Sequence, residues 1–270
     1  MLLIIICAVA LVLFFIIRKK VKYPKVGAFA MVTGAVKSGK STFSVGLAIR
    51  EHKRVLRKVK FVNFFRRLFG KSLEEIPLLY SNIPLAYKYY SPVTTQHLRR
   101  EARFNYRSIC YLCEASLIAD SMTFNDKLLN EQINLFCKLF GHATKGGKCI
   151  VDTQAICDLH FGFKRNTTTD FFIHHTLNIP LFPWLILKVQ EERYSEDGQV
   201  LANEDIEDRL SIVFVSKSTW KKFDCYCYST FTDDKPTINK PHFATYLKVT
   251  DLNGSTFRRF YTIRSKKDEN

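Results

Sequence analysis

The chain has 270 residues, which suits one large α/β domain with short appendages, and it has no internal repeat or low-complexity segment, which excludes a repeat array. Its 41 Lys and Arg residues against 25 Asp and Glu residues give a formal net charge of +16. Such a surface is expected to meet a polyanion, either nucleic acid or the anionic cytoplasmic face of a membrane, and the charge alone does not distinguish the two.

Residues 1–17 contain no charged or strongly polar side chain, and the basic stretch Arg18-Lys19-Lys20-Val21-Lys22 follows them. Seventeen residues is the low end of the length that a bilayer-spanning helix needs. A cleavable signal peptide would carry its charge before the apolar run, and Ile6 before Cys7 argues against a lipoprotein site. We therefore expect a transmembrane anchor over 1–17 and a basic juxtamembrane linker over 18–26; a signal peptide and a buried core helix are the alternatives.

The basic flank of this anchor also predicts its orientation. Positively charged flanks stay in the cytoplasm, so the N-terminus is expected outside and everything after Arg18 inside. The sequence thus predicts a single-pass membrane protein with a cytoplasmic domain.

The most informative motif follows a strand-like run, Ala28 to Val32, and precedes a helix-like run, Thr42 to His52. It matches the phosphate-loop pattern G-x-x-x-x-G-K-S with Gly34, Ala35, Val36, Lys37, Ser38, Gly39, Lys40 and Ser41. Backbone N–H groups of such a loop, and the positive end of the helix after it, bind phosphate. We expect Lys40 to reach the β/γ-phosphates and Ser41 to ligate Mg²⁺, with Thr42 beside them. A nucleoside triphosphate and Mg²⁺ are therefore the predicted ligands; a glycine turn that matches by chance would lack this strand and helix context.

A basic, phenylalanine-rich segment runs from Arg50 to Lys71 and holds nine basic residues and one acid. Its apolar residues recur at helical spacing, at Phe61, Phe64, Phe65, Leu68 and Phe69. This stripe could pack on the protein's own domain as an ordinary amphipathic helix, or lie in a lipid interface. Its charge could also serve DNA, but phenylalanines gathered on one face favour contact with a membrane or a neighbouring subunit.

Beyond this segment, alternating strand-like and helix-like runs indicate a P-loop NTPase fold, a mainly parallel sheet flanked by helices. Strands are expected over 78–82, 108–113 and 148–152, and a helix over 127–140. Helical signals fade after about residue 170, so the C-terminal part is expected to be β-rich, with strands over 185–194 and 210–215 and a hairpin around Asn253-Gly254. The ATPase domain is therefore placed at 27–230, and a C-terminal hairpin extension and tail at 231–270.

Two strand ends carry candidate catalytic residues. The 108–113 run ends in Cys113-Glu114, where Glu114 stands in the place of the base that polarises the attacking water. Cys113 stands where an Mg²⁺-orienting aspartate is usual, and a neutral thiol is a poor ligand for that hard cation. The next strand ends in Asp152-Thr153-Gln154, which places Gln154 to sense the γ-phosphate. For Glu114, a solvated cap of the following segment is the alternative role. Arg165 is a candidate for the arginine that ring motors supply to a neighbouring subunit.

The eight cysteines do not show the pattern of a structural zinc site. Cys110 and Cys113 have C-x-x-C spacing but lie within an apolar strand-like run. Zinc sites need two tight pairs presented from turns. We interpret the cysteines as small buried hydrophobic residues.

Several of these features occur in one order: the phosphate loop with Thr42, the strand end LLYSNIPL, Glu114-Ala115, the strand end VDTQ, and Phe223-Asp224-Cys225-Tyr226. That order resembles the ATPase domain of the zonular occludens toxin (Zot) family, the inner-membrane assembly proteins of filamentous phages. The resemblance implies an ATPase of the host inner membrane that exports single-stranded phage DNA, working with phage coat and assembly proteins as a homo-oligomeric ring. The chain departs from the family in having Cys113 where Asp is usual, and in carrying its apolar segment before the ATPase domain.

Two other interpretations stay open. One is a membrane scaffold that binds nucleotide with little or no hydrolysis, which Cys113 favours. The other is a P-loop kinase or GTPase, which the lack of a clear N-K-x-D segment and the expected anchor weaken.

Overall fold

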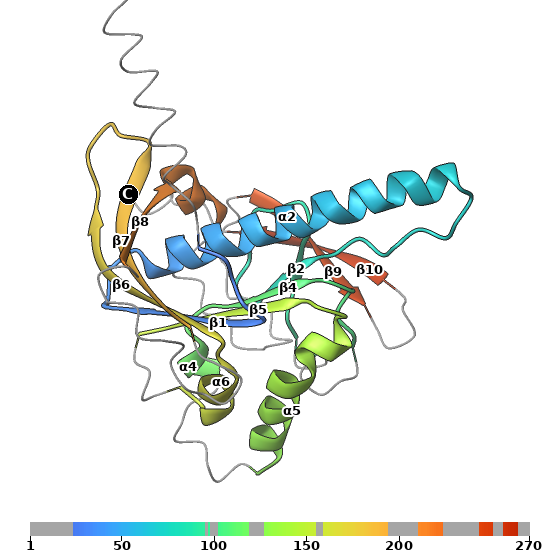
Figure 1. The fold of residues 1–270 in the computed structure, drawn as a ribbon, viewed down its shortest axis with the longest axis horizontal. Coiled ribbons are helices and arrows are strands. Elements are labelled where there is room, and N and C mark those ends of the chain that lie inside the picture. The colour runs from blue at the N-terminus through green and yellow to red at the C-terminus, as the bar shows by residue number, and fades with distance from the viewer. Residues whose placement is uncertain are drawn as a thin grey trace, which may run out of the picture.

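The computed structural model describes residues 24–94, 97, 102–118, 127–154, 159–193, 210–223, 243–250 and 256–263. Eight strands form one sheet in the order β3-β2-β4-β5-β1-β6-β7-β8 (Figure 1). Their bounds are β1 Phe29–Gly34, β2 Leu79–Ser81, β3 Tyr90–Pro92, β4 Ile109–Leu112, β5 Lys148–Thr153, β6 Thr169–Leu177, β7 Trp184–Arg193 and β8 Leu210–Ser216. The strands from β3 to β6 in this order pair in parallel, and β7 and β8 complete the sheet antiparallel.

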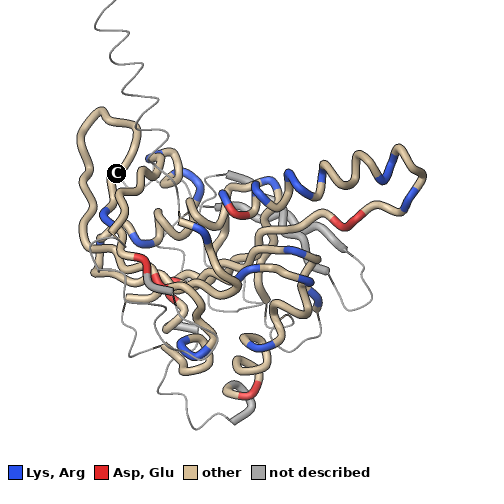
Figure 2. The backbone as a smooth tube through the Cα atoms, viewed as in Figure 1, with Lys and Arg blue, Asp and Glu red and all other residues tan. Residues whose placement is uncertain are grey.

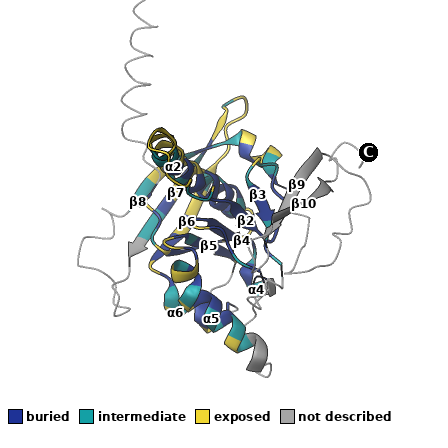
Figure 3. Cartoon of the chain, turned by 90° about the vertical axis from the view of Figure 1, so that its right-hand side faces the viewer, coloured by how far each residue is buried: buried dark blue, intermediate teal, exposed yellow. Residues whose placement is uncertain are grey.

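Helices cover both faces of the sheet, as a mostly parallel sheet requires. The long helix α2 (Lys40–Leu68) lies along one face, and α4 (Ala115–Ile118), α5 (Lys127–Ala143) and α6 (Phe161–Asn166) lie on the other (Figures 1 and 3). A short 3₁₀ helix, η3 (Lys217–Lys222), follows β8. The sheet is therefore the middle layer of three.

Strand β1 joins the two layers of core. Its side chains alternate, so that Ala30 and Val32 pack with Phe43 of α2, whereas Met31 packs with Phe163 on the opposite face. All six residues of β1 are buried. A strand buried on both faces reads as a continuous apolar run, which explains the sequence FAMVTG and fixes β1 at the centre of the sheet.

Most elements expected from the sequence are present. The α/β architecture with a mainly parallel sheet is confirmed, and β9 (Phe243–Thr250) pairs with β10 (Thr256–Ile263) in the expected antiparallel hairpin. Strand β6 was not predicted. Its exposed polar residues, such as His174 and His175, interrupt the apolar pattern, and its ladder with β7 shifts register at that point.

The phenylalanine stripe at 61–69 is not packed on its own domain, so that alternative is wrong for the stripe. It forms the last turns of α2, a single helix of 29 residues, and Phe61, Phe64, Phe65 and Leu68 are exposed there. Val59 is the last buried residue of α2, so the helix runs past the edge of the domain that it covers.

Among the described residues, no helix is both long and apolar enough to cross a bilayer. The anchor predicted over 1–17 and most of the linker over 18–26 lie outside those residues. The same holds for Asp224, Cys225 and Tyr226 of the Zot-like order.

His52 fastens the middle of α2 to the connection that precedes β2. Its Nε2 lies 2.9 Å from the carbonyl oxygen of Pro77 and its Nδ1 lies 2.8 Å from the hydroxyl of Tyr87. A carbonyl only accepts, so Nε2 carries the proton of the neutral ring and Nδ1 accepts from Tyr87. Burial lowers the pKa of His52 from 6.5 to about 4, an effect that the hydrogen bond to Pro77 partly offsets.

The substitution His52→Gln tests this neutral contact through pH. The pKa of His52 is lower in the folded than in the unfolded chain, so its stabilising effect is complete above pH 6.5 and is lost as the pH falls towards 4. We expect the difference in unfolding free energy between wild type and variant to narrow by about 2 kcal/mol from pH 7 to pH 5, measured by urea unfolding. A difference that stays constant over this range would contradict the buried neutral histidine.

Candidate nucleotide-binding site

The phosphate loop lies between the buried end of β1 and the first turn of α2. Gly34 has φ 155° and Gly39 has φ 82°, both in the region that favours glycine. A Cβ on Gly34 would lie 2.9 Å from Ser38 Oγ, and a Cβ on Gly39 would lie 3.1 Å from Thr176 Oγ1. Thr176 of β6 also donates to the carbonyl of Ser38, which holds the loop against its neighbouring strand. The two glycines of the motif are therefore required by the tight path of the backbone.

The donors around this loop fit a phosphate group. Gly39 is the N-cap of α2 and no side chain among the described residues caps the helix, so the first N–H groups face outward. Within the same part of the chain, Ser38 Oγ and Lys40 Nζ are buried without a hydrogen-bond partner, although Lys40 forms an ion pair. An uncapped helix start, a buried ammonium and an unsatisfied hydroxyl together form an anion cradle. These residues fit the phosphates of ATP.

The sheet brings three strand ends to this place. Because β4, β5 and β1 are neighbours and parallel, their carboxyl ends lie at one edge of the sheet. The Oε1 atom of Glu114, directly after β4, lies 3.2 Å from Lys40 Nζ. It also accepts a hydrogen bond of 3.1 Å from Nε2 of Gln154, directly after β5. Lys40, Glu114 and Gln154, which are up to 114 positions apart in the sequence, thus meet beside the phosphate loop.

Asp152 is the central buried acid of the site, and the sequence marked it only as a strand end. Its Oδ1 accepts from the backbone N–H of Glu114 at 2.6 Å and its Oδ2 accepts from the Tyr111 hydroxyl at 2.7 Å. Burial raises the pKa of Asp152 from 3.8 to about 6, against the opposite effects of the Glu114 N–H, Lys40 and Tyr111. Glu114 has φ 46°, so this bond holds a residue in a conformation that is unfavourable for most side chains. An apolar strand that ends in Asp was the only sequence signal for it.

Cys113 places a thiol beside Ser41, where the strand pattern led us to expect a carboxylate. Asn82, at the end of β2, donates to its carbonyl at 2.9 Å and accepts from its N–H at 2.7 Å. The side chain of Ser41 hydrogen-bonds the thiol. Burial, followed by the nearby charge of Asp152, raises the pKa of Cys113 well above its ordinary value. The thiol is therefore neutral, and Ser41 is the residue placed to ligate Mg²⁺, with the remaining ligands expected from phosphate and water.

Two predicted site residues lie in other surroundings. The hydroxyl of Thr42 accepts a hydrogen bond of 2.8 Å from the indole of Trp220 in η3, so this side chain ties the start of α2 to η3. Arg165 is exposed on α6, whose end leads directly into the start of β6. The start of β6 pairs with the start of β1, whereas the phosphate loop follows the end of β1. Arg165 thus lies at the opposite edge of the sheet from Lys40.

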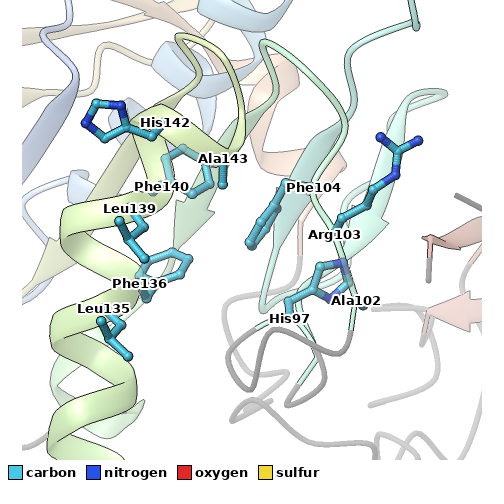
Figure 4. A pocket seen from close by; sticks show the side chains of 10 residues that line it. All are labelled: His97, Ala102, Arg103, Phe104, Leu135, Phe136, Leu139, Phe140, His142 and Ala143. Carbon is cyan, nitrogen blue, oxygen red and sulfur yellow. The ribbon is translucent and has the colours of Figure 1, made fainter. Parts of the chain in front are cut away.

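An apolar pocket lies away from this site, between α5 and the segment before β4 (Figure 4). It has a volume of about 360 Å³, and its lining is mostly aliphatic and aromatic, including Phe104, Leu135, Phe136, Leu139 and Phe140. Arg103, His97 and His142 are its polar members. This lining does not match the dense donor set that a triphosphate needs, so the phosphate loop remains the nucleotide site.

Comparisons with known proteins show that this chain is similar to a number of solved structures, three of which follow. The N-terminal domain of zonular occludens toxin from Neisseria meningitidis is 13% identical, with a TM-score of 0.41, and the match covers 74% of this chain and 100% of that chain. A genome-packaging NTPase from Sulfolobus turreted icosahedral virus 2, in complex with AMP, is 10% identical with a TM-score of 0.32, covering 72% and 98%. A KaiC-like protein from Pyrococcus horikoshii is 11% identical with a TM-score of 0.34, covering 70% and 89%. No family model matches the sequence, and no curated protein matches it.

The chain's own geometry carries the fold assignment. A buried central strand, a phosphate loop with left-handed glycines and a long helix follow one another, within a mostly parallel sheet that has helices on both faces. This is the architecture of a P-loop NTPase.

Lys40→Ala tests the phosphate cradle. The variant loses the buried ammonium, and charge-assisted hydrogen bonds contribute roughly 1.5–3 kcal/mol each, so we expect ATP affinity to fall about tenfold to a hundredfold. Isothermal titration calorimetry measures the change. Lys58→Ala removes an exposed ammonium from the same helix and is the matched control, expected to leave affinity unchanged. Equal ATP affinity of folded Lys40→Ala and wild type would disprove this site.

Proposed function

We propose that this protein is a membrane-anchored ATPase that couples ATP hydrolysis to filamentous-phage assembly and to the export of single-stranded phage DNA. The observation that carries the proposal is the meeting of Lys40, Glu114 and Gln154 beside the phosphate loop. The Zot-like order of motifs supports the role in phage assembly. The apolar run over 1–17 supports a single span in the host inner membrane, with the N-terminus outside and the ATPase domain in the cytoplasm.

Each residue of the site has a part in the proposed hydrolysis. Bound Mg²⁺-ATP supplies the phosphoanhydride bond and a cation that offsets phosphate charge. Lys40 and the N–H groups of the loop bind the phosphate oxygens, and Ser41 Oγ ligates the cation. Glu114, held by Lys40 and Gln154, orients the attacking water and accepts its proton. Gln154 can contact the γ-phosphate and Glu114 together, so it would link the occupied site to the base.

The proposed motor is a homo-oligomeric ring that meets phage coat proteins and single-stranded DNA. The place of Arg165, at the edge of the sheet opposite Lys40, leaves it no part in its own subunit's site. It is exposed and carries no acid neighbour in α6, which suits delivery of its guanidinium to the phosphates of an adjacent copy.

A second function, a nucleotide-binding membrane scaffold, is favoured by one observation. Cys113 offers a neutral, buried thiol beside Ser41 where a carboxylate would help to order Mg²⁺. Such a site binds nucleotide through the phosphate loop and turns it over slowly or not at all. Hydrolysis measurements separate the two functions.

Glu114→Gln is the decisive variant. General-base catalysis contributes roughly a hundredfold to ten-thousandfold, so we expect phosphate release by the full chain in lipid nanodiscs, with and without single-stranded DNA, to fall at least a hundredfold. ATP affinity should change little, because Lys40 and the loop remain. Glu131→Gln, an exposed carboxylate on α5, is the control with wild-type turnover. Wild-type turnover no higher than that of Glu114→Gln would instead support the scaffold.

Cys113→Asp tests the missing carboxylate. It places a second acid next to buried Asp152, so the unliganded protein should melt at a lower temperature than wild type. Mg²⁺ near Ser41 would offset that repulsion, so stabilisation by ATP should depend on Mg²⁺ more strongly than in wild type. Differential scanning calorimetry with ATP, with and without Mg²⁺, measures both effects. Cys113→Asn, which is polar but neutral, is the control; equal Mg²⁺ dependence in all three proteins would place the cation elsewhere.

A further inference from the structure

The end of α2 and the segment that returns from it form an arm beyond the domain, here defined as residues 60–76 (Figure 1). Most of its large apolar side chains face solvent. Their exposed fractions are 66% for Phe61, 59% for Phe64, 42% for Phe65, 64% for Leu68, 72% for Phe69 and 52% for Leu73. Six exposed apolar side chains within 13 consecutive residues mark a contact surface.

The arm is held in shape by polar contacts that do not use its phenylalanines. The side chain of Asn63 donates to the carbonyl of Glu74 at 2.9 Å and accepts from the N–H of Glu74 at 2.7 Å. Arg66 donates to the carbonyl of Ser72 at 3.0 Å and pairs with the Glu74 carboxylate at 3.2 Å. These bonds fasten the return segment to the helix. The aromatic face is therefore left unpartnered by the described chain while its backbone is fixed.

The exposed rings form one continuous face. Phe61, Phe64, Phe65 and Leu68 follow the i, i+3, i+4, i+7 spacing of a single helix side. The ring of Phe65 packs edge-on against Phe61 and Phe64, with centroid distances of 4.9 Å and 5.5 Å. The result is a compact apolar wedge.

Lys and Arg recur along the end of α2 and the start of the segment that returns from it (Figure 2). The sequence between Glu51 and Glu74 has no acid and eight basic residues, which are Lys53, Arg54, Arg57, Lys58, Lys60, Arg66, Arg67 and Lys71. Lys60 and Arg67 are exposed in the same turns of α2 as the rings, and Arg57 and Lys58 are exposed one turn before them. Glu74, the first acid after the wedge, is paired with Arg66 and Arg107. The arm thus presents an apolar centre and a cationic rim.

We propose that this arm is a membrane-docking element that inserts its phenylalanines into the surface of an anionic bilayer. Apolar rings beside Lys and Arg match the acyl boundary and the anionic headgroups of such a surface. A second copy fits less well, because two arms face to face would bring together two sets of four basic residues, Lys60, Arg66, Arg67 and Lys71. Single-stranded DNA fits less well too, because base stacking needs open ring faces and these rings pack on one another. The arm would orient the domain on the membrane whether or not nucleotide is hydrolysed.

The test uses the full chain with a local reporter, because residues 1–17 could bind vesicles independently. Phe65→Trp places an indole in the wedge. Vesicles contain brominated phosphatidylcholine with or without about one third phosphatidylglycerol, and their bromines quench an indole that enters the acyl region. We expect the introduced indole to be quenched by anionic vesicles and much less by neutral ones. Wild type corrects for the native Trp184 and Trp220, and Ile212→Trp, at an exposed apolar position of β8, should show no quenching.

Charge reversal completes the test. The double substitution Lys60→Glu and Arg67→Glu is made in the Phe65→Trp background. It should raise the concentration of anionic vesicles needed for half-maximal quenching at least tenfold, because each basic residue contributes to attraction by an anionic surface. Retained ATP affinity shows that each variant is folded. Absence of quenching by anionic vesicles overturns the proposal. A change of indole fluorescence with oligothymidine, or with protein concentration, in place of lipid quenching would overturn it in favour of DNA or of a second copy.

Discussion

The parallel pairing of β4, β5 and β1 is the constraint on which the site depends. Parallel neighbours end at the same edge, so Glu114 and Gln154 emerge beside the loop that follows β1. The pairing also explains why the candidate base lies two strands from the phosphate loop: β5 separates β4 from β1 and places Gln154 between Glu114 and the loop. A register shift of one residue in this region would turn Glu114 or Asp152 to the other face of the sheet.

Asp152 shows how this edge is kept in order. A fully buried carboxylate is costly unless its oxygens are hydrogen-bonded, and both oxygens of Asp152 are, by Tyr111 and by the N–H of Glu114. Lys40 supplies a nearby positive charge. The same contacts hold Glu114 in its left-handed backbone conformation. The strain of that conformation is tolerated because the hydrogen bonds of Asp152 fix it, and the direction of the Glu114 side chain is fixed with it. Asn82 fixes the backbone of Cys113 in a similar way, because its side chain hydrogen-bonds both the carbonyl and the N–H of that residue.

Helix α2 joins two different surfaces. Its 29 residues span about 43 Å, so a single rigid element carries the phosphate-binding end and the aromatic arm. Burial changes along it: the first five turns pack on the sheet, and the turns after Val59 lie outside the domain. The bonds of His52, near the middle of the helix, hold the buried part to the segments before and after β2 and thus set the direction of the exposed part.

The sequence by itself determined that the nucleotide site is of the phosphate-loop type and that a mainly parallel sheet is flanked by helices. The phosphate loop is local, because eight consecutive residues between a strand and a helix specify its backbone, and the apolar runs of β1, β4 and β5 predict buried strands. Cys113-Glu114 and Gln154 were recognised because polar residues end apolar runs. The hairpin of β9 and β10 followed from its turn dipeptide.

Only the tertiary structure decided what depends on distant partners. Strand β6 was missed because paired exposed histidines hide its period, and with it the anchoring of the loop by Thr176. The network of Asp152 spans some 40 residues, which no local pattern encodes. The phenylalanine stripe had the same spacing whether it was packed or free, since periodicity identifies a face but not what covers it. The phenylalanine face is exposed because α2 extends beyond the sheet that it covers. Where the sheet ends depends on how the strands pair, and only the tertiary structure shows that pairing.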